Sequence, residues 1–358
     1  MSRSRTLPLA IFATLIVLVQ ITAGLANKGQ YLTQLTMAAY YSLPILGLTL
    51  LMGYAGQISI GHAGFFAIGG YTSGFLTTTN LTEHSSSWWV RLAARLYLLV
   101  LSQDAFGSPT LVMRAWPGCI AALLITALVG YLIGKPVLRL KGHFLAMATL
   151  GFGTIVYRLV LGTSALGAAD GISDVPAFHL LPGLDVSGKS ALRISNYYVA
   201  WGLVLMTVIL LGNLIHSRVG RAMRAIHGAE EAATASGIDT QDTKLKMFVL
   251  SAVLAALGGV FLTHYNGGIG PSEASIMKSV RMVAIVAIGG MANLWGALIM
   301  GVALNFLSMR GSFGSYDDAV FGVILLLIML FSPQGLLRAD LAQRLLRPIL
   351  RRPKEPVT

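Results

Sequence analysis

The sequence is poor in charged residues. Asp, Glu, Lys and Arg make up 11% of its 358 residues, while 55% of the residues are hydrophobic. A soluble domain carries roughly 25% charged residues, so this chain lacks the polar side chains that would cover a surface in water. Its mean hydropathy of +0.72 agrees with this. These shortages exclude a soluble globular protein and predict a chain that lies within a lipid bilayer.

Cysteine and acidic residues are also scarce. The single cysteine, Cys119, excludes an intrachain disulfide and is expected to be a small buried apolar residue. The net charge is +12, yet the basic residues flank apolar segments and are not interleaved with aromatic residues. This distribution follows the positive-inside rule and argues against a nucleic-acid partner. No metal-ligand spacing and no nucleophile–base pair is evident, so we expect no metal, no cofactor and no enzymatic activity.

Long apolar runs predict the fold class. A run of about 20 apolar residues crosses a bilayer as a helix, because backbone groups in lipid must pair within their own segment. We therefore expect an all-α integral membrane protein, a polytopic bundle of about 8–10 transmembrane helices, some of them broken by glycine. The apolar spans lie at residues 7–25, 32–52, 60–78, 112–137, 143–162, 196–215, 246–266, 279–291, 293–308 and 318–333.

The distribution of basic residues predicts the orientation. Ten spans, an even number, place the N- and C-termini together in the cytoplasm, with a transmembrane domain at 1–337 and a basic cytoplasmic tail at 338–358. We expect the run 7–25 to be a retained first helix; a cleaved secretory signal is the alternative. The polar regions 80–114 and 162–196 then lie outside.

Residues 183–190 match the nucleotide-binding pattern GxxxxGK[ST]. That motif requires a buried strand before the loop and a second strand that ends in Asp, whereas here Pro176 and Pro182 precede it and an apolar span follows. The sequence predicts an external turn at this position and no nucleotide site.

One long polar segment, 217–246, stands between two apolar spans. It is basic, and basic loops of membrane proteins face the cytoplasm. Glu230 and Glu231 suit the start of a short helix, and Gly237 suits its end, where positive φ is common. We interpret this helix as a docking element for a soluble partner; a solvated connector is the alternative.

Seven glycines fall within residues 53–74. Glycine destabilises a helix by about 1 kcal/mol relative to alanine, so their density needs an explanation. Close packing of helices through small residues is one, and a discontinuous helix that lines a solute path is the other. Gln57, Ser59 and His62, with Thr149 from a later span, would give such a path weak polar contacts.

Few ionisable residues fall inside the spans or at their edges. For the histidines we favour a structural role over ligand contact, and we expect the two residues at a span edge, Lys278 and Arg281, to extend toward the membrane interface. The candidates inside the spans are His62, His143, Arg158 and His264. No Asp or Glu lies in the interior of a span, which disfavours an ion-coupled secondary transporter.

Several motifs in order resemble the LivM-type permeases of branched-chain amino acid ABC transporters, a family with urea and short-amide relatives. The resemblance extends over residues 32–337. Two departures are HGA at 227–229, where the family is usually more charged, and the long external stretch 80–110. The motifs are GYAGQISIGHAGFFAIGGYTSGFL at 53–76, LRLKGHFLAMATLGFG at 138–153, GAADGI at 167–172, the loop 220–237, IGG at 288–290 with WG at 295–296, and SPQGL at 332–336.

This resemblance implies a permease subunit of a binding-protein-dependent ABC importer in the bacterial inner membrane. The implied partners are a second homologous permease, two ABC ATPase subunits, which hydrolyse the ATP, and an extracytoplasmic solute-binding protein. The implied solutes are branched-chain or other apolar amino acids, with urea or a short-chain amide as the alternative. The residues implied to couple to the ATPase are Arg221, Glu230, Glu231, Ala232, Ala233 and Gly237.

Overall fold

The computed structural model describes residues 3–26, 28–82, 87–103, 109–311 and 316–331. The expected tail 338–358 and the motif at 332–336 lie outside these residues. Within them, each of the ten apolar spans contains one helix of 14 residues or more, which confirms the expected all-α membrane fold. These helices are α1 (Arg3–Leu25), α2 (Gln30–Thr49), α3 (His62–Thr78), α5 (Ala115–Val137), α6 (His143–Gly162), α7 (Arg193–His216), α10 (Thr240–Asn266), α11 (Ile276–Gly289), α12 (Leu294–Met309) and α13 (Asp317–Phe331).

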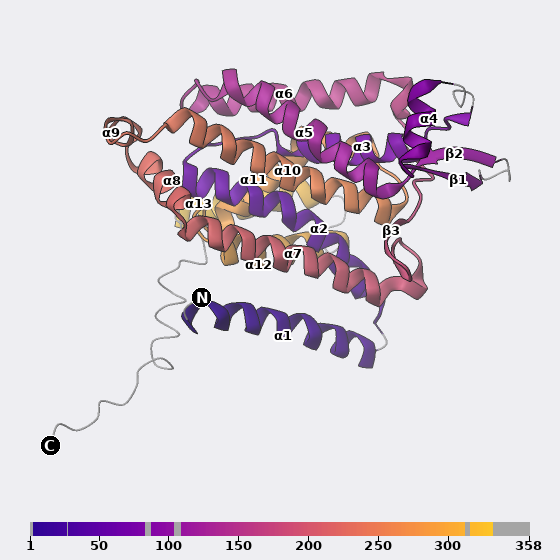
Figure 1. Ribbon diagram of the computed structural model, residues 1–358. Coiled ribbons are helices and arrows are strands. Elements are labelled where there is room, and N and C mark those ends of the chain that lie inside the picture. The colour runs from indigo at the N-terminus through magenta and orange to yellow at the C-terminus, as the bar shows by residue number, and fades with distance from the viewer. Residues whose placement is uncertain (1–2, 27, 83–86, 104–108, 312–315, 332–358) are drawn as a thin grey trace.

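Six segments of the described chain are long and apolar enough to cross a membrane. They contain α1, α2, α5, α6, α7 and α10. The helices α3, α11, α12 and α13 are shorter, as expected for the first three, whose spans are short or broken by glycine. The long helices run roughly side by side (Figure 1).

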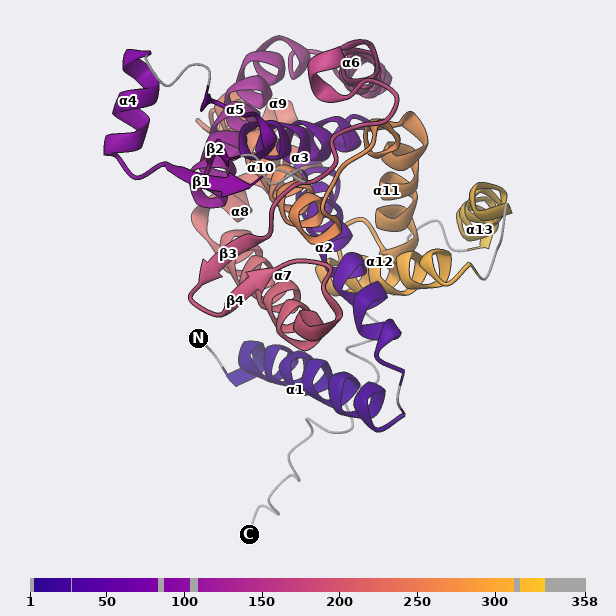
Figure 2. The same ribbon diagram turned by 90° about the vertical axis from the view of Figure 1, so that its right-hand side faces the viewer.

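The core of the bundle forms around α10. This helix packs against α3, α2 and α5, and Ala252, Ala255 and Val260 on it are fully buried. Figure 2 shows α10 and α2 at the centre, with α1 and α13 at the edges. Most apolar side chains of α1 are exposed, as expected for a helix that faces lipid.

The two ends of the bundle differ. One end carries α8 (Arg218–Gly228) and α9 (Glu230–Ala235), and the start of α1 lies at this end (Figure 1). The other end carries α4 (Trp88–Arg95) and two antiparallel hairpins, β1 (Leu99–Gln103) with β2 (Pro109–Met113) and β3 (Phe178–Leu181) with β4 (Leu184–Val186). The loop 217–246 and the regions 80–114 and 162–196 therefore lie at opposite ends, as predicted.

The segment that matches the nucleotide-binding pattern belongs to the second hairpin. Gly183, with φ of +83°, lies in the turn between β3 and β4, and β4 occupies the middle of the pattern. A two-stranded hairpin provides no buried parallel strand to support a phosphate-binding loop. The turn predicted from the sequence is confirmed.

Two helices are interrupted along their course. At the first interruption, α2 ends in a π-helical turn, Leu50–Tyr54, and residues 56–61 are not α-helical before α3 begins at His62. At the second, α10 ends at Gly267, with φ of +69°, and residues 267–275 contain one short 3-10 turn, η5 (Pro271–Ala274), before α11. For the glycines at the first interruption, the sequence offered a discontinuous helix and close helix packing as two explanations, and it gave no prediction for the second interruption.

Candidate functional site

The polar loop folds into two short helices. Ser217 caps α8 by accepting a hydrogen bond from the backbone N–H of Gly220. Glu230 and Glu231 begin α9, and Gly237, with φ of +82°, follows its end. The N–H of Ile238 donates to the carbonyl of Ala233 and the N–H of Gly237 to that of Thr234, a Schellman arrangement. The predicted helix is therefore present.

Helix α8 was not anticipated from the sequence. Its buried residues, Gly220, Met223 and Ile226, recur every third position, and together with the Ser217 cap they are the signal that could have revealed it.

The predicted coupling residues differ in exposure. Arg221, Glu231, Ala232 and Gly237 are exposed, whereas Ala233 is buried. Exposed residues of both helices are thus available to a soluble partner.

Glu230 turns back toward the bundle. Its carboxylate pairs with the Nζ of Lys244 on α10 at 2.5 Å, and the Lys244 side chain is only 10% exposed. This ion pair ties the first turn of α9 to the helix at the centre of the core.

The first helix interruption lies against α8. A Cβ added at Gly56, whose φ is +68°, would lie 2.6 Å from Nδ1 of His227. Nearby, the Tyr54 hydroxyl donates to the carbonyl oxygen of Ala292 at 2.7 Å, in the turn between α11 and α12. Only glycine permits such an approach of α8 to this backbone. The loop and the glycine-rich segment, which the sequence suggested separately, are therefore neighbours in space.

A buried network holds the start of α3. Nδ1 of His62 is 3.1 Å from the Ser59 hydroxyl, and Nε2 is 2.7 Å from the hydroxyl of Ser251 on α10. Thr149 on α6 accepts a hydrogen bond from the N–H of Ile60 at 3.0 Å. Both ring nitrogens of His62 are thus hydrogen-bonded, which agrees with the structural role expected for it.

Gln57 contrasts with its neighbours. Its side chain is buried, yet neither amide atom has a hydrogen-bond partner among the residues that the structure describes. An unpaired buried amide is unfavourable by about 1–3 kcal/mol, which sets Gln57 apart from the hydrogen-bonded side chains around it.

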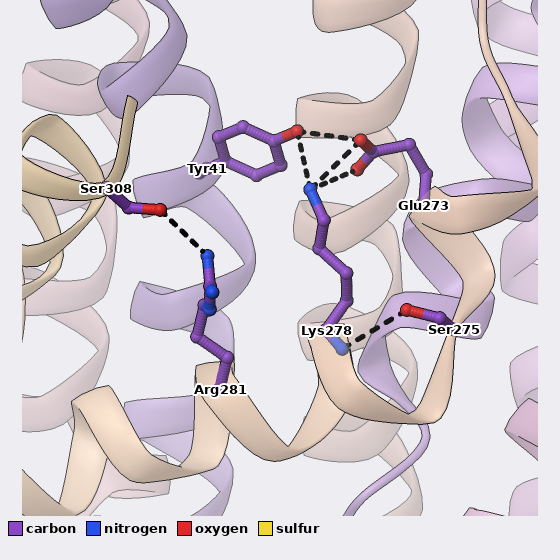
Figure 3. Close-up of polar contacts among 6 residues, drawn as sticks. All are labelled: Tyr41, Glu273, Ser275, Lys278, Arg281 and Ser308. Carbon is purple, nitrogen blue, oxygen red and sulfur yellow. Dashed lines mark hydrogen bonds and ion pairs between the residues drawn. The ribbon is translucent and has the colours of Figure 1, made fainter. Parts of the chain in front are cut away.

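A charged cluster, which the sequence interpretation missed, lies at the second interruption (Figure 3). Nζ of Lys278 on α11 is 3.0 and 3.1 Å from the carboxylate oxygens of Glu273 in η5. The Tyr41 hydroxyl on α2 donates to Glu273 at 2.9 Å and accepts from Lys278 at 3.0 Å. Arg281 donates to the Ser308 hydroxyl on α12 at 3.1 Å.

The expectation that Lys278 and Arg281 extend to the interface is wrong. Both side chains point between helices, because Glu273, Tyr41 and Ser308 offer polar partners there. Glu273 was overlooked because it falls in a polar gap between two apolar spans. The nearest sequence signal is Ser275, which caps α11 and so fixes Glu273 close to the first turn that carries Lys278.

The bundle, the exposed helical loop at one end and the interrupted helices define the class of the protein: a multi-pass membrane permease. Residues 30–331 match the family described as "Branched-chain amino acid transport system / permease component". The match spans most of the chain, and the protein therefore belongs to this family.

Individual relatives agree with this assignment. The chain is 29% identical to the high-affinity branched-chain amino acid transport system permease protein LivM of Salmonella typhimurium, covering 84% of this chain and 68% of the relative. It is 26% identical to LivH of Escherichia coli K12, covering 86% and 94%, and 25% identical to BraD of Pseudomonas aeruginosa, again covering 86% and 94%. No solved structure matches the chain.

Proposed function

We propose that this protein is the permease subunit of a binding-protein-dependent ABC importer that moves branched-chain and other apolar amino acids across the bacterial inner membrane. The observation that carries the proposal is α9, a short exposed helix bonded to the central helix α10 through Glu230 and Lys244. The names of the relatives support the solute class.

The proposed assembly contains a second homologous permease, two ABC ATPase subunits and an extracytoplasmic solute-binding protein. The ATPases hydrolyse ATP, and this subunit contributes the path and the docking helix. Both termini lie in the cytoplasm with α8 and α9. The basic residues of the loop support this orientation.

Motion of the docked loop would reach the path by two routes. The first passes from α9 through Lys244 to α10, and from Ser251 to His62 at the start of α3. The second passes from His227 of α8 directly to the backbone of Gly56. Closure of the ATPases would thus bias the first interruption between two states, as alternating access requires.

Gln57, Ser59, His62 and Thr149 are the polar side chains proposed for the path at this interruption. The unpaired amide of Gln57 supports this role, because a passing solute would supply its hydrogen bonds. His62, Ser59 and Thr149 hold the surrounding backbone in place and would act through position more than through direct contact.

Two other functions remain alternatives. A urea or short-amide importer would use the same assembly. An ion-coupled secondary transporter would need a carboxylate that binds and releases a cation, and Glu273 lies among the helices; its ion pair with Lys278 disfavours that use.

The test reconstitutes the four-subunit membrane complex with its binding protein in proteoliposomes. Calorimetric titration of the binding protein against leucine, valine, urea and acetamide identifies the solute. Uptake should require ATP on the side of the membrane that carries the ATPase subunits. It should be lost when this permease subunit is left out. Tight urea binding with no response to leucine would move the assignment to the urea branch. Uptake driven by an ion gradient without ATP would refute the importer.

A further inference from the structure

The charged cluster lies deep among the helices. Tyr41 follows the first residue of α2 by eleven positions, which places it about 16 Å along the axis at 1.5 Å per residue. That is roughly half of a hydrocarbon core about 30 Å thick. Ser279, one residue after Lys278, accepts a hydrogen bond from the N–H of Ala63 at the start of α3. The second interruption therefore brings Glu273 and Lys278 to the middle of the bundle.

Irregular backbone at this depth has a physical meaning. Backbone groups outside helices are tolerated within a membrane where protein buries them or where they line a solute path. Part of this stretch is paired, since Ile269 and Ile172 exchange backbone hydrogen bonds at 2.9 Å. The segment after it, 270–275, carries Glu273 toward α2.

The ion pair is accessible. The side chains of Lys278 and Glu273 are 28% and 17% exposed, so neither is sealed in the core. A cavity of about 20 Å³, large enough for one water-sized group, lies beside Lys278 and Tyr41. Its lining combines polar side chains, Tyr41, Lys278, Arg281 and Asn305, with apolar ones, Ile45, Met282 and Ile285.

We propose that this cluster is a transient contact site for a zwitterionic α-amino acid during translocation. The solute's carboxylate takes the place of Glu273 at Lys278, with Arg281 one turn further along α11. The solute's ammonium group takes the place of Lys278 at Glu273 and at the Tyr41 hydroxyl oxygen. Each charge keeps a partner, and the net charge of the site changes by nothing, because a zwitterion is neutral overall.

The apolar lining would favour solutes with an aliphatic side chain, and the preformed ion pair would favour release of the bound solute. Ile45, Met282 and Ile285 line the same cavity and would offer apolar contacts to an aliphatic side chain. When the solute leaves, Lys278 and Glu273 pair again. Because this ion pair competes with the solute for the same charged groups, the solute is bound weakly. Urea and acetamide carry no full charges and would leave both ions unpaired. This inference rests on the proposed importer function and narrows it to amino acids.

The experiment removes both charges together, because a single neutralisation would leave a buried charge unpaired. The variant is Glu273→Gln with Lys278→Met in the complete importer in proteoliposomes. The matched control is His179→Gln with Asp185→Asn, which removes another ion pair from the β3–β4 hairpin, at the end of the bundle. Leucine uptake and binding-protein-stimulated ATP hydrolysis are measured for both.

We expect leucine uptake by the cluster variant to fall about tenfold or more, the equivalent of about 1.4 kcal/mol. Stimulated ATP hydrolysis should stay within about twofold of the parent, since the docking loop is untouched. The hairpin control should keep both activities. Parental uptake by the cluster variant would overturn the zwitterion site while leaving the importer function intact; failure of the parent to import leucine would instead overturn the importer function.

A second variant covers the case in which the first does not insert. Exchanging the charges, Glu273→Lys with Lys278→Glu, keeps an ion pair that can hold the fold. It moves the cation away from Arg281 and so separates the two groups that receive the solute's carboxylate. Uptake should remain at the low level. Recovery of parental uptake in this exchange would show that the pair serves the fold alone and would refute the proposal.

Discussion

Each of the two helix interruptions places a non-helical segment between two helices, but the side chains at the two places differ in charge. At the first, residues 56–61, the side chains are uncharged and the backbone touches α8 of the exposed loop. At the second, residues 267–275 lead to an acid–base pair beside α2, far along the helix from that loop. In the proposed importer, the comparison separates two requirements: the first interruption would receive motion from the docked loop, and the second would present charged groups to the solute.

The largest expected effect comes from breaking a close contact between α3, which follows the first interruption, and α10, which precedes the second. A Cβ at Gly259 of α10 would overlap the carbonyl oxygen of Phe66 on α3. Gly259→Val should force these helices apart, with a cost of about 1–3 kcal/mol or more for overpacking. We expect loss of inserted protein and of all uptake, as measured by membrane quantification and transport assays. Gly202→Val, at a glycine of α7 with no atom within 4 Å, is the control and should insert normally.

The next largest effect is expected from changes in the polar loop that carries α9, and it should be confined to coupling with the ATPase subunits. Gly237→Val places a β-branched residue at φ of +82°, a strain of about 1–3 kcal/mol, and should distort the end of α9. Uptake and stimulated ATP hydrolysis should be lost while the protein inserts at the parental level. Glu231→Lys, which reverses an exposed charge, should have the same result. Gly237→Asn is the control, because Asn tolerates this conformation. Parental uptake by both altered proteins would contradict the coupling role.

A moderate effect is expected from the hydrogen bond that joins α10 to the first interruption. Ser251→Ala removes the partner of His62 Nε2. Hydrogen bonds between membrane helices contribute about 0.6–1.7 kcal/mol, so uptake should fall about three- to eighteenfold. Thr207→Val is the control, since the Thr207 hydroxyl bonds only to Leu203 of its own helix. Equal uptake in both variants would indicate that α10 does not act on α3 through His62.

The smallest effect on transport should come from cysteines that report which side each end faces. In a Cys119→Ala background, cysteines at Lys141 and Ser236 should react with an impermeant thiol reagent only after permeabilisation. A cysteine at Lys189 should react in intact cells. All three positions are exposed, whereas Ser187 beside the last is buried and unsuitable. Labelling of Lys189 only after permeabilisation would reverse the proposed orientation.

The difference between the interruptions also shows what the sequence could predict. The first could be predicted because seven glycines and a resemblance to known permeases mark it within the chain itself. The signals that predict the short helix α9 are also close together in the sequence, with acidic residues at its start and a glycine after its end. Such features depend on neighbours along the chain, which a sequence displays directly.

The second interruption could not be predicted in this way. Tyr41 and Glu273 are 232 positions apart, and nothing in the sequence around either residue indicates that the two are in contact. A polar gap between two apolar runs fits an external loop as well as a segment that enters the bundle, because hydropathy records composition and not depth. The unpaired amide of Gln57 is a similar case, since the sequence gives the residue but not its lack of partners.

The close packing of α3 and α10 has a kinematic consequence. Besides the contact at Gly259, α10 bonds to α3 near both of its ends, through Ser251 to His62 and through His264 to Ser73. Two helices joined at three heights resist sliding, tilting and rotating against each other, so we expect them to move as one rigid unit. A displacement of the loop that reached α10 would then also move α3 and be felt towards the opposite end of the bundle.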